Sequence, residues 1–128
     1  MQIRIARPSR DLRAARRFYG EALGLPVVAS FDDHDGYSGI VFGLPDVSRQ
    51  LELVTREGEQ PTPTEEDQLV LYLGSAEALD ATASRLRVAG FESRVPANPY
   101  WGRTGAVCFV DLDGYWLILS PEAWPEAR

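Results

Sequence analysis

The sequence has no run of about 18 apolar residues, the length that a membrane-spanning helix requires. A membrane protein is therefore excluded, and a membrane is not an expected partner. The first residues, Met1 to Ile5, alternate in polarity and do not place an apolar stretch after a basic one, as a secretion signal does. We expect that nothing is cleaved and that the protein is cytoplasmic.

Cysteine is almost missing. The single one, Cys108, cannot form an internal disulfide. It lies in the apolar run 106–110, which predicts a buried and unreactive thiol in preference to a catalytic one.

Positive charge is scarce as well. Lys and Arg total 13 against 19 Asp and Glu, so the formal net charge is −6. Nucleic acid is not an expected partner, because its phosphates require a basic surface. A solvated helix face explains the one basic cluster better than a phosphate track does; its members are Arg10, Arg13, Arg16 and Arg17.

At 128 residues a single domain with one core is expected. Apolar residues at helical spacing predict one helix from Asp11 to Leu23 and another from Ser75 to Ala89, with Gly24 and Gly90 just past their ends. Alternating patterns predict strands at 2–6, 26–31, 38–43, 49–55, 68–73, 91–95, 105–110 and 115–120.

The second half repeats the first at an offset of 66 residues. The matched pairs include Gly24 and Gly90, Gly36 and Gly102, Gly39 and Gly105, Val41 and Val107, and Leu51 and Leu117. This indicates an α+β fold of two tandem βαβββ modules, whose curved mixed sheet forms a cup with the helices outside. The modules span about 1–56 and 68–121, with a linker at about 57–67 and a tail at 122–128.

Side chains alternate between the two faces of a strand, so the outer strands of the modules divide into two sets. One set is uniformly aliphatic and should pack against the helices: Ile3, Ile5, Leu51, Leu53, Leu69, Leu71, Leu73, Leu117 and Leu119. The other is mixed and suits a ligand cavity, or else a face covered by solvent or a subunit: Gln2, Arg4, Ala6, Gln50, Glu52, Val54, Gln68, Val70, Tyr72, Trp116, Ile118 and Ser120.

Several strings, taken in order, resemble the vicinal-oxygen-chelate superfamily, which includes glyoxalases, bleomycin resistance proteins and extradiol dioxygenases. They are Ser9-Arg10-Asp11-Leu12, Phe18-Tyr19, Leu23-Gly24-Leu25, Leu51-Glu52-Leu53 and Asp111-Leu112-Asp113-Gly114-Tyr115. Asn98-Pro99-Tyr100-Trp101 and the segment 31–37 resemble a bacterial subgroup of glyoxalase-like proteins. The resemblance implies a small-molecule ligand and a homodimer.

In metal-dependent members of that superfamily, a divalent ion is held from the first and last strands of each repeat. The positions that match here are Arg4, Glu52, Val70 and Ile118. Only Glu52 has a side chain that suits such an ion, because Val and Ile have no donor atom and Arg is cationic. No metal site and no cofactor are therefore expected, unless ligands outside these positions hold a metal.

Glu52 and Arg4 are the candidate catalytic residues, since strand parity places them on one face. They would form either an ion pair or a functional pair, in which Glu52 is a general base and Arg4 stabilises an anion.

The candidate ligand-binding residues lie in two predicted hairpins and on the mixed face: His34, Tyr37, Gln50, Tyr72, Tyr100, Trp101, Arg103 and Trp116. His34 is either a ligand contact or a solvated turn residue. The aromatic hairpin at 100–103 would close over a ligand or pack in a subunit interface. An EF-hand at Gly36 is excluded, because Phe31 and Phe42 would occupy ligand positions.

Three functions remain open at this stage. The first is a metal-free, drug-sequestering type of binding protein. The second is a lyase, isomerase or dioxygenase, and the third is a structural or protein-interaction role.

Overall fold

A computed structural model describes residues 1–124 of the chain. Two compact units are present, Met1–Thr62 and a second that begins at Pro63, and each is described by itself. The division falls inside the predicted linker, which forms neither helix nor strand. No helix in the described part is long and apolar enough to cross a membrane. Part of the predicted tail, 125–128, lies outside the described residues.

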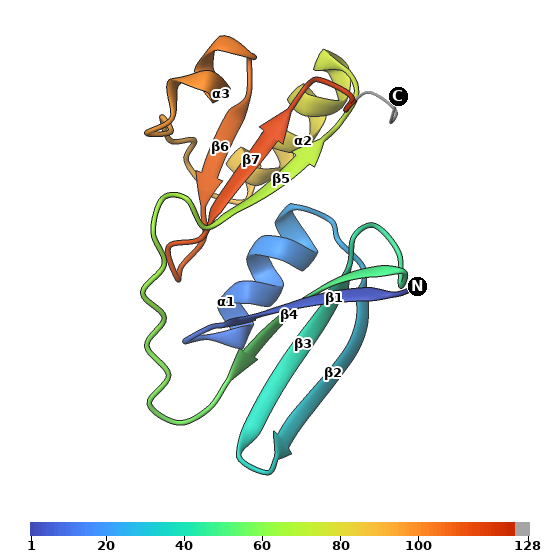
Figure 1. Ribbon diagram of the computed structural model, residues 1–128, viewed down its shortest axis with the longest axis vertical. Coiled ribbons are helices and arrows are strands. Elements are labelled where there is room, and N and C mark those ends of the chain that lie inside the picture. Colours follow the sequence, from blue (N-terminus) through green and yellow to red (C-terminus); the bar gives the residue numbers. More distant parts are fainter. Residues whose placement is uncertain (125–128) are drawn as a thin grey trace. The chain divides into compact units, whose positions relative to one another are not determined.

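Unit 1 is one βαβββ module (Figure 1). Its elements are β1 (Ile3–Pro8), α1 (Leu12–Ala15) continued by η1 (Arg16–Ala22), β2 (Val27–His34), β3 (Tyr37–Gly43) and β4 (Arg49–Thr55). The strand order is β1-β4-β3-β2, with β1 parallel to β4 and the other neighbours antiparallel. This order is what a βαβββ unit produces when its helix crosses over one face of the sheet.

The predicted helix of unit 1 forms where its local signals indicate. The Asp11 carboxylate accepts hydrogen bonds from the backbone N–H groups of Arg13 and Ala14, as an N-cap does. The turns after Ala15 are wider than in an α-helix, so that the N–H of Leu23 donates to the carbonyl of Phe18, five residues earlier. The chain leaves the helix through Gly24, at φ +91°.

Unit 2 has the same strand order as unit 1, but its sheet has three strands where that of unit 1 has four. Its elements are β5 (Gln68–Tyr72), α2 (Ala76–Val88), α3 (Pro99–Arg103), β6 (Val107–Val110) and β7 (Trp116–Ser120), in the strand order β5-β7-β6. The strand predicted at 91–95 is wrong, because the segment makes only an isolated bridge between Arg94 and Cys108. The hairpin predicted at 100–103 is also wrong, since this segment is the helix α3.

The α+β fold with two tandem modules is confirmed, but the constant offset of 66 residues is not. Arg4 lies opposite Gln50 in unit 1, whereas Gln68 lies opposite Trp116 in unit 2. If the last strands are matched at that offset, Gln50 with Trp116, the counterpart of Arg4 is Gln68, and Val70 corresponds to Ala6. On the third strand, Val41 lies opposite Glu52 and Cys108 opposite Ile118, so that Val41 corresponds to Cys108 and not to Val107. Loops of different length shift these strands while the strand order is kept.

The aliphatic face is confirmed on the last strands of both modules, where its members are buried: Leu51, Leu53, Leu117 and Leu119. The prediction is wrong for Ile3 and Ile5, which are 50% and 54% exposed. Both lie on β1, at the edge of the sheet.

The string around Asp111 has a structural role in unit 2. The buried carboxylate of Asp111 accepts hydrogen bonds from the backbone N–H groups of Asp113, at 2.9 Å, and Tyr115, at 3.0 Å. These bonds hold the turn that leads into β7, with Gly114 at φ +98°.

We expect Asp111→Ala to lower the free energy of unfolding by about 1–3 kcal/mol, because two buried N–H groups lose their acceptor. Asp111→Asn keeps one acceptor oxygen and should lose less than half as much. Urea unfolding of both variants measures the difference. Equal losses would contradict the acceptor role.

Candidate functional site

The mixed face of unit 1 carries a polar group on its edge strand β1 and the neighbouring strand β4. Arg4 and Gln50 are opposite each other on β1 and β4, and the Arg4 Nε donates to the Gln50 Oε1 at 2.9 Å. The Gln50 amide in turn donates to the carbonyl of Val47 at 2.9 Å. These bonds link the exposed Arg4 side chain to β4 and to the segment before it.

Glu52 lies on the same face as Arg4, two positions along β4 from Gln50. Within residues 1–124, no ion pair joins the Arg4 and Glu52 side chains, because Arg4 is held by Gln50 and Glu52 lies opposite Ala6. The interpretation of the two residues as a simple ion pair is therefore wrong. The Glu52 side chain is partly buried.

Gly39 leaves space for the Phe31 ring beside Glu52. A methyl group added to Gly39 would lie 2.5 Å from Phe31 Cζ and 3.2 Å from Glu52 Oε2. The Phe31 ring therefore lies across Gly39, with the Glu52 carboxylate beside it. Val41, which is opposite Glu52, is 1% exposed. Glu52 is thus an anion with an aromatic ring and an aliphatic side chain as neighbours.

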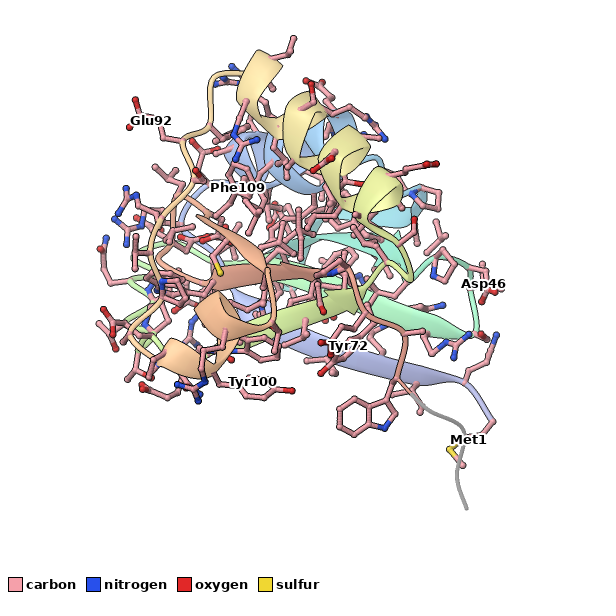
Figure 2. The ribbon with its side chains drawn as sticks, turned by 90° about the horizontal axis from the view of Figure 1, so that it is seen from above. Met1, Asp46, Tyr72, Glu92, Tyr100 and Phe109 are labelled. Atoms are coloured by element: carbon pink, nitrogen blue, oxygen red, sulfur yellow. The ribbon has the colours of Figure 1, made fainter. Side chains whose placement is uncertain are left out.

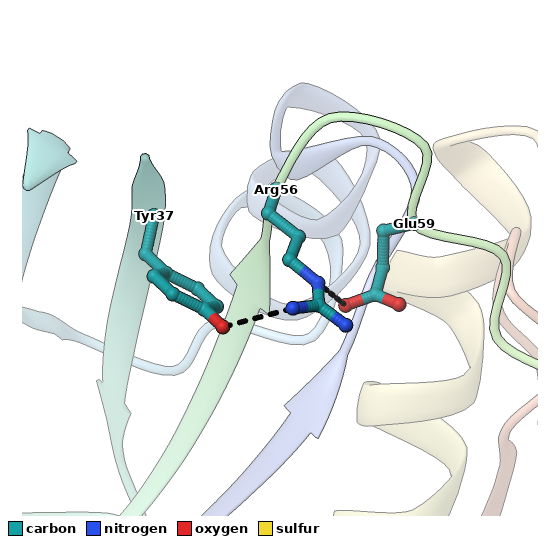
Figure 3. A network of polar contacts seen from close by, with 3 residues as sticks. All are labelled: Tyr37, Arg56 and Glu59. Atoms are coloured by element: carbon teal, nitrogen blue, oxygen red, sulfur yellow. Dashed lines mark hydrogen bonds and ion pairs between the residues drawn. The ribbon is translucent and has the colours of Figure 1, made fainter. Parts of the chain in front are cut away.

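Tyr37 belongs to a small network at the end of this sheet (Figure 3). Arg56 Nη1 donates to the Tyr37 hydroxyl at 3.0 Å, and the guanidinium carbon lies 5.7 Å from the Tyr37 ring centroid. Arg56 Nε also lies 4.0 Å from Glu59 Oε1. Arg56 is a candidate that sequence reasoning missed, since it follows the strand end and meets Tyr37 only across the sheet.

The side chain of His34 is more exposed to solvent than is usual for a residue in a ligand pocket. It lies at the β2–β3 turn, where Asp33 and Asp35 have φ angles of 48° and 53°. The His34 side chain is 83% exposed, and its Nε2 is 3.9 Å from the Asp35 carboxylate. The offset of 66 residues matches His34 with Tyr100, but Tyr100 is in the helix α3 and not in a hairpin turn. A ligand contact of His34 stays a prediction.

The mixed face of unit 2 is packed. Four buried residues form an apolar cluster: Trp101, Cys108, Trp116 and Ile118. Val70, Ala106 and Val110 pack against it. In Figure 2, α2 lies on one side of the β5-β7-β6 sheet and α3 on the other. The prediction of an open cavity wall is therefore wrong for Trp116 and Ile118, which Trp101 from α3 helps to cover.

The other candidates of unit 2 are more accessible. Tyr100 is 41% and Tyr72 36% exposed, and Figure 2 shows both on the side of the sheet where α3 lies. The Tyr72 ring is 5.4 Å from Trp124, and the Tyr100 ring meets Trp101 edge-on at 5.0 Å. Arg103, at the end of α3, is exposed. Ligand binding by these residues stays a prediction.

Known proteins share both modules. The family model of the YycE-like N-terminal domain matches residues 3–54, and that of the YycE-like C-terminal domain matches residues 66–120. The uncharacterized protein YycE of Bacillus subtilis is 40% identical over 119 residues, which cover 91% of this chain and 85% of that protein. The chain belongs to the YycE-like family.

Solved structures place this YycE-like chain in the vicinal-oxygen-chelate superfamily, as the resemblance predicts. The crystal structure of a Bacillus subtilis YycE protein of unknown function has a TM-score of 0.91 at 35% identity, with 99% of this chain and 93% of that chain covered. The fosfomycin resistance protein FosX from Mesorhizobium loti has a TM-score of 0.72 at 15% identity, with 96% and 92% covered. A glyoxylase/bleomycin resistance protein/dioxygenase domain from Frankia has a TM-score of 0.70 at 23% identity, with 91% and 93% covered. The last two show the fold alone.

The residues of this YycE-like chain do not fit the metal of its superfamily. Arg4 is a cation whose Nε–H already donates a hydrogen bond to Gln50. Ile118 is fully buried in an apolar cluster. Gln68, the true counterpart of Arg4, directs its amide nitrogen to the Glu65 carbonyl at 3.0 Å. Among the described residues, no three His, Cys, Asp or Glu side chains form a group that could hold an ion. One carboxylate, Glu52, is too few for a divalent cation.

Cys108 should be unreactive in the folded YycE-like chain. The residue is 1% exposed, and burial raises the pKa of its thiol from 9.0 to about 11. We expect alkylation by iodoacetamide at neutral pH to be about 100-fold slower than in denaturant, because the thiolate is the nucleophile. Native and denatured rates at the same pH would contradict this if they were similar.

The same pKa shift predicts an alkaline loss of stability. In the unfolded chain the Cys108 thiol ionises near its ordinary pKa, while in the folded chain it stays neutral up to the raised value of about 11. The stabilisation that the neutral Cys108 thiol gives to the folded chain is thus complete below pH 9.0, and it is lost as the pH rises toward 11. Comparison with Cys108→Ala across this range isolates the thiol from the tyrosines, which also titrate at high pH.

Proposed function

We propose that this protein binds a small organic molecule, as a member of the glyoxalase and bleomycin-resistance type that does not use the metal positions of the superfamily. The observation that carries the proposal is the polar face of unit 1, where Arg4 is held by Gln50 and the Glu52 carboxylate lies beside the Phe31 ring. An anion with an aromatic neighbour suits a ligand that combines positive charge with a flat apolar body.

The relatives support the general class of ligand. The solved neighbours are named as a fosfomycin resistance protein, a glyoxalase I and a glyoxalase/bleomycin resistance protein. A further neighbour, FosX from Listeria monocytogenes, was solved with Mn(II) and a dihydroxypropylphosphonic acid. We propose that the present chain differs from that protein in needing no metal, and that it acts in the cytoplasm.

A thermal-shift screen tests the binding function. Chelator-treated protein is mixed with cationic aromatic compounds including bleomycin, with fosfomycin, and with small 2-oxo acids and thiol adducts, each with and without Ni, Zn, Mn or Fe. A ligand that binds only the folded chain raises its melting temperature. The proposal expects a metal-independent shift with a cationic aromatic compound. Absence of any shift across the panel would refute it.

The second candidate is an enzyme of lyase, isomerase or dioxygenase type. It is favoured by the fact that the Glu52 carboxylate is not neutralised by Arg4. Glu52 would then take a proton from the substrate as general base, and the fixed Arg4 guanidinium would stabilise the resulting anion. A non-standard metal site that uses Glu52 is the remaining variant. Product formation from a 2-oxo acid or a thiol adduct would favour this class over simple binding.

We also propose that the protein is a homodimer, and that β1 lies in the subunit contact. Exposure of Ile3 and Ile5 on one face of an edge strand supports this proposal. Ile5→Asp should weaken dimerisation at least about tenfold, as expected for a charge placed in an apolar contact. Sedimentation velocity measures it, with Val88→Asp on α2 as the exposed control. A monomeric wild-type chain would contradict the proposal.

A further inference from the structure

Trp101 has a buried donor that the described chain does not use. Its side chain is 8% exposed, and no acceptor among the described residues receives a hydrogen bond from the indole Nε1. A buried donor without a partner costs about 1–3 kcal/mol, and buried tryptophans normally satisfy this group. The surroundings explain the lack of a protein acceptor, because the cluster consists of apolar side chains and one thiol.

The element that carries Trp101 is a short helix with one buried residue. Trp101 is the one buried residue of α3, whereas Pro99, Tyr100, Gly102 and Arg103 are exposed. The helix is internally well capped, since the Asn98 side chain accepts from the N–H of Tyr100 at 3.0 Å. The contact of α3 with the cluster therefore depends on one buried side chain.

We propose that Trp101 is a ligand-recognition residue, which moves with α3 to admit a neutral, flat molecule to the apolar face of unit 2 and donates its indole N–H to a carbonyl oxygen of that molecule. The ligand is neutral because the four residues of the cluster are uncharged, and an unpaired charge among them would be costly. It is flat and apolar because its neighbours would be Val70, Trp116 and Ile118. This inference goes beyond the proposed function, because it concerns the apolar face of unit 2 by itself and a neutral molecule.

The probe pair is acetophenone and ethylbenzene, which have similar shapes and differ in the carbonyl oxygen. The indole N–H signals of the full chain are followed by ¹H–¹⁵N NMR and assigned with Phe variants of the three tryptophans. Acetophenone should move the Trp101 Nε1–H signal downfield and ethylbenzene should not. Equal shifts with both probes, or no shift with either, would overturn the inference. So would a resident water that already accepts from this N–H in the free protein.

A variant separates the hydrogen bond from apolar packing. Trp101→Phe keeps an aromatic ring and removes the donor, so the preference for acetophenone over ethylbenzene should fall about fivefold. Trp124→Phe, at a residue that is 70% exposed, should leave the preference unchanged. If Trp101→Phe does not fold, the wild-type NMR shift remains the deciding result. A Trp101 signal that neither probe moves, beside a thermal shift with a cationic aromatic compound, would refute this inference and leave the proposed function intact.

Discussion

Replacing Trp116 by alanine is expected to lower the free energy of unfolding by about 3–5 kcal/mol, the usual loss when a large core aromatic is truncated. Trp116 is 9% exposed and belongs to the packed cluster of unit 2. Gln50 occupies the corresponding sheet position in unit 1 and is partly buried, with bonds to Arg4 and Val47. Gln50→Ala should therefore cost less than about 1 kcal/mol.

This matched pair of variants tests whether the mixed face is part of the core in unit 2 and not in unit 1. Urea unfolding of both variants gives the two losses directly. A large loss for Trp116→Ala with a small loss for Gln50→Ala means that the face of unit 2 is a core and the face of unit 1 is not. Similar losses would mean that the polar face of unit 1 is structural.

Glu52→Gln is expected to weaken the binding of a cationic aromatic ligand at least about tenfold, because the variant removes the charge from a charge-assisted contact and keeps the shape of the side chain. Stability should change by less than about 0.5 kcal/mol, since Glu52 has no ion-pair partner in the described chain. Titration calorimetry with a hit from the screen measures the affinity. Glu21→Gln, on the exposed side of the helix, is the control.

The same variant distinguishes binding from catalysis. In an enzyme that uses Glu52 as general base, Glu52→Gln would lower kcat by about 10²-fold or more while substrate still binds. In a binding protein, affinity falls and there is no turnover to lose. Unchanged affinity and unchanged turnover together would remove Glu52 from the site.

Much of the fold follows from local signals in the sequence. The cap at Asp11 and the turn at Gly24 delimit the first helix, and Ser75 and Gly90 do the same for the second. These contacts span a few residues, so a sequence pattern records them. The helix α3 could have been found in the same way, because Asn98-Pro99 is an N-cap followed by proline at the first helical position.

Local signals did not predict how the strands of the two modules correspond, or which segment covers the mixed face of unit 2. The counterpart of Arg4 is Gln68 because the loops of the two modules differ in length. A single constant offset cannot match both the first and the last strands. Strand parity correctly grouped Trp116 with Ile118, but parity does not state what lies on top of a face. The cover, Trp101, comes from a segment that the repeat pattern assigned to a hairpin.

The site was predicted in part for the same reason. Parity placed Arg4, Gln50 and Glu52 on one face, as the structure has them, but it paired Arg4 with Glu52 when the guanidinium instead meets Gln50. Arg56 was missed because its partner Tyr37 is 19 residues away in sequence.

The most direct test of metal-free binding at the polar face is one titration, with the best screening hit, of chelator-treated wild-type protein in the presence and absence of Mn(II). The account predicts the same affinity in both conditions, and a loss of that affinity in Glu52→Gln. An affinity that appears only when Mn(II) is added would contradict it.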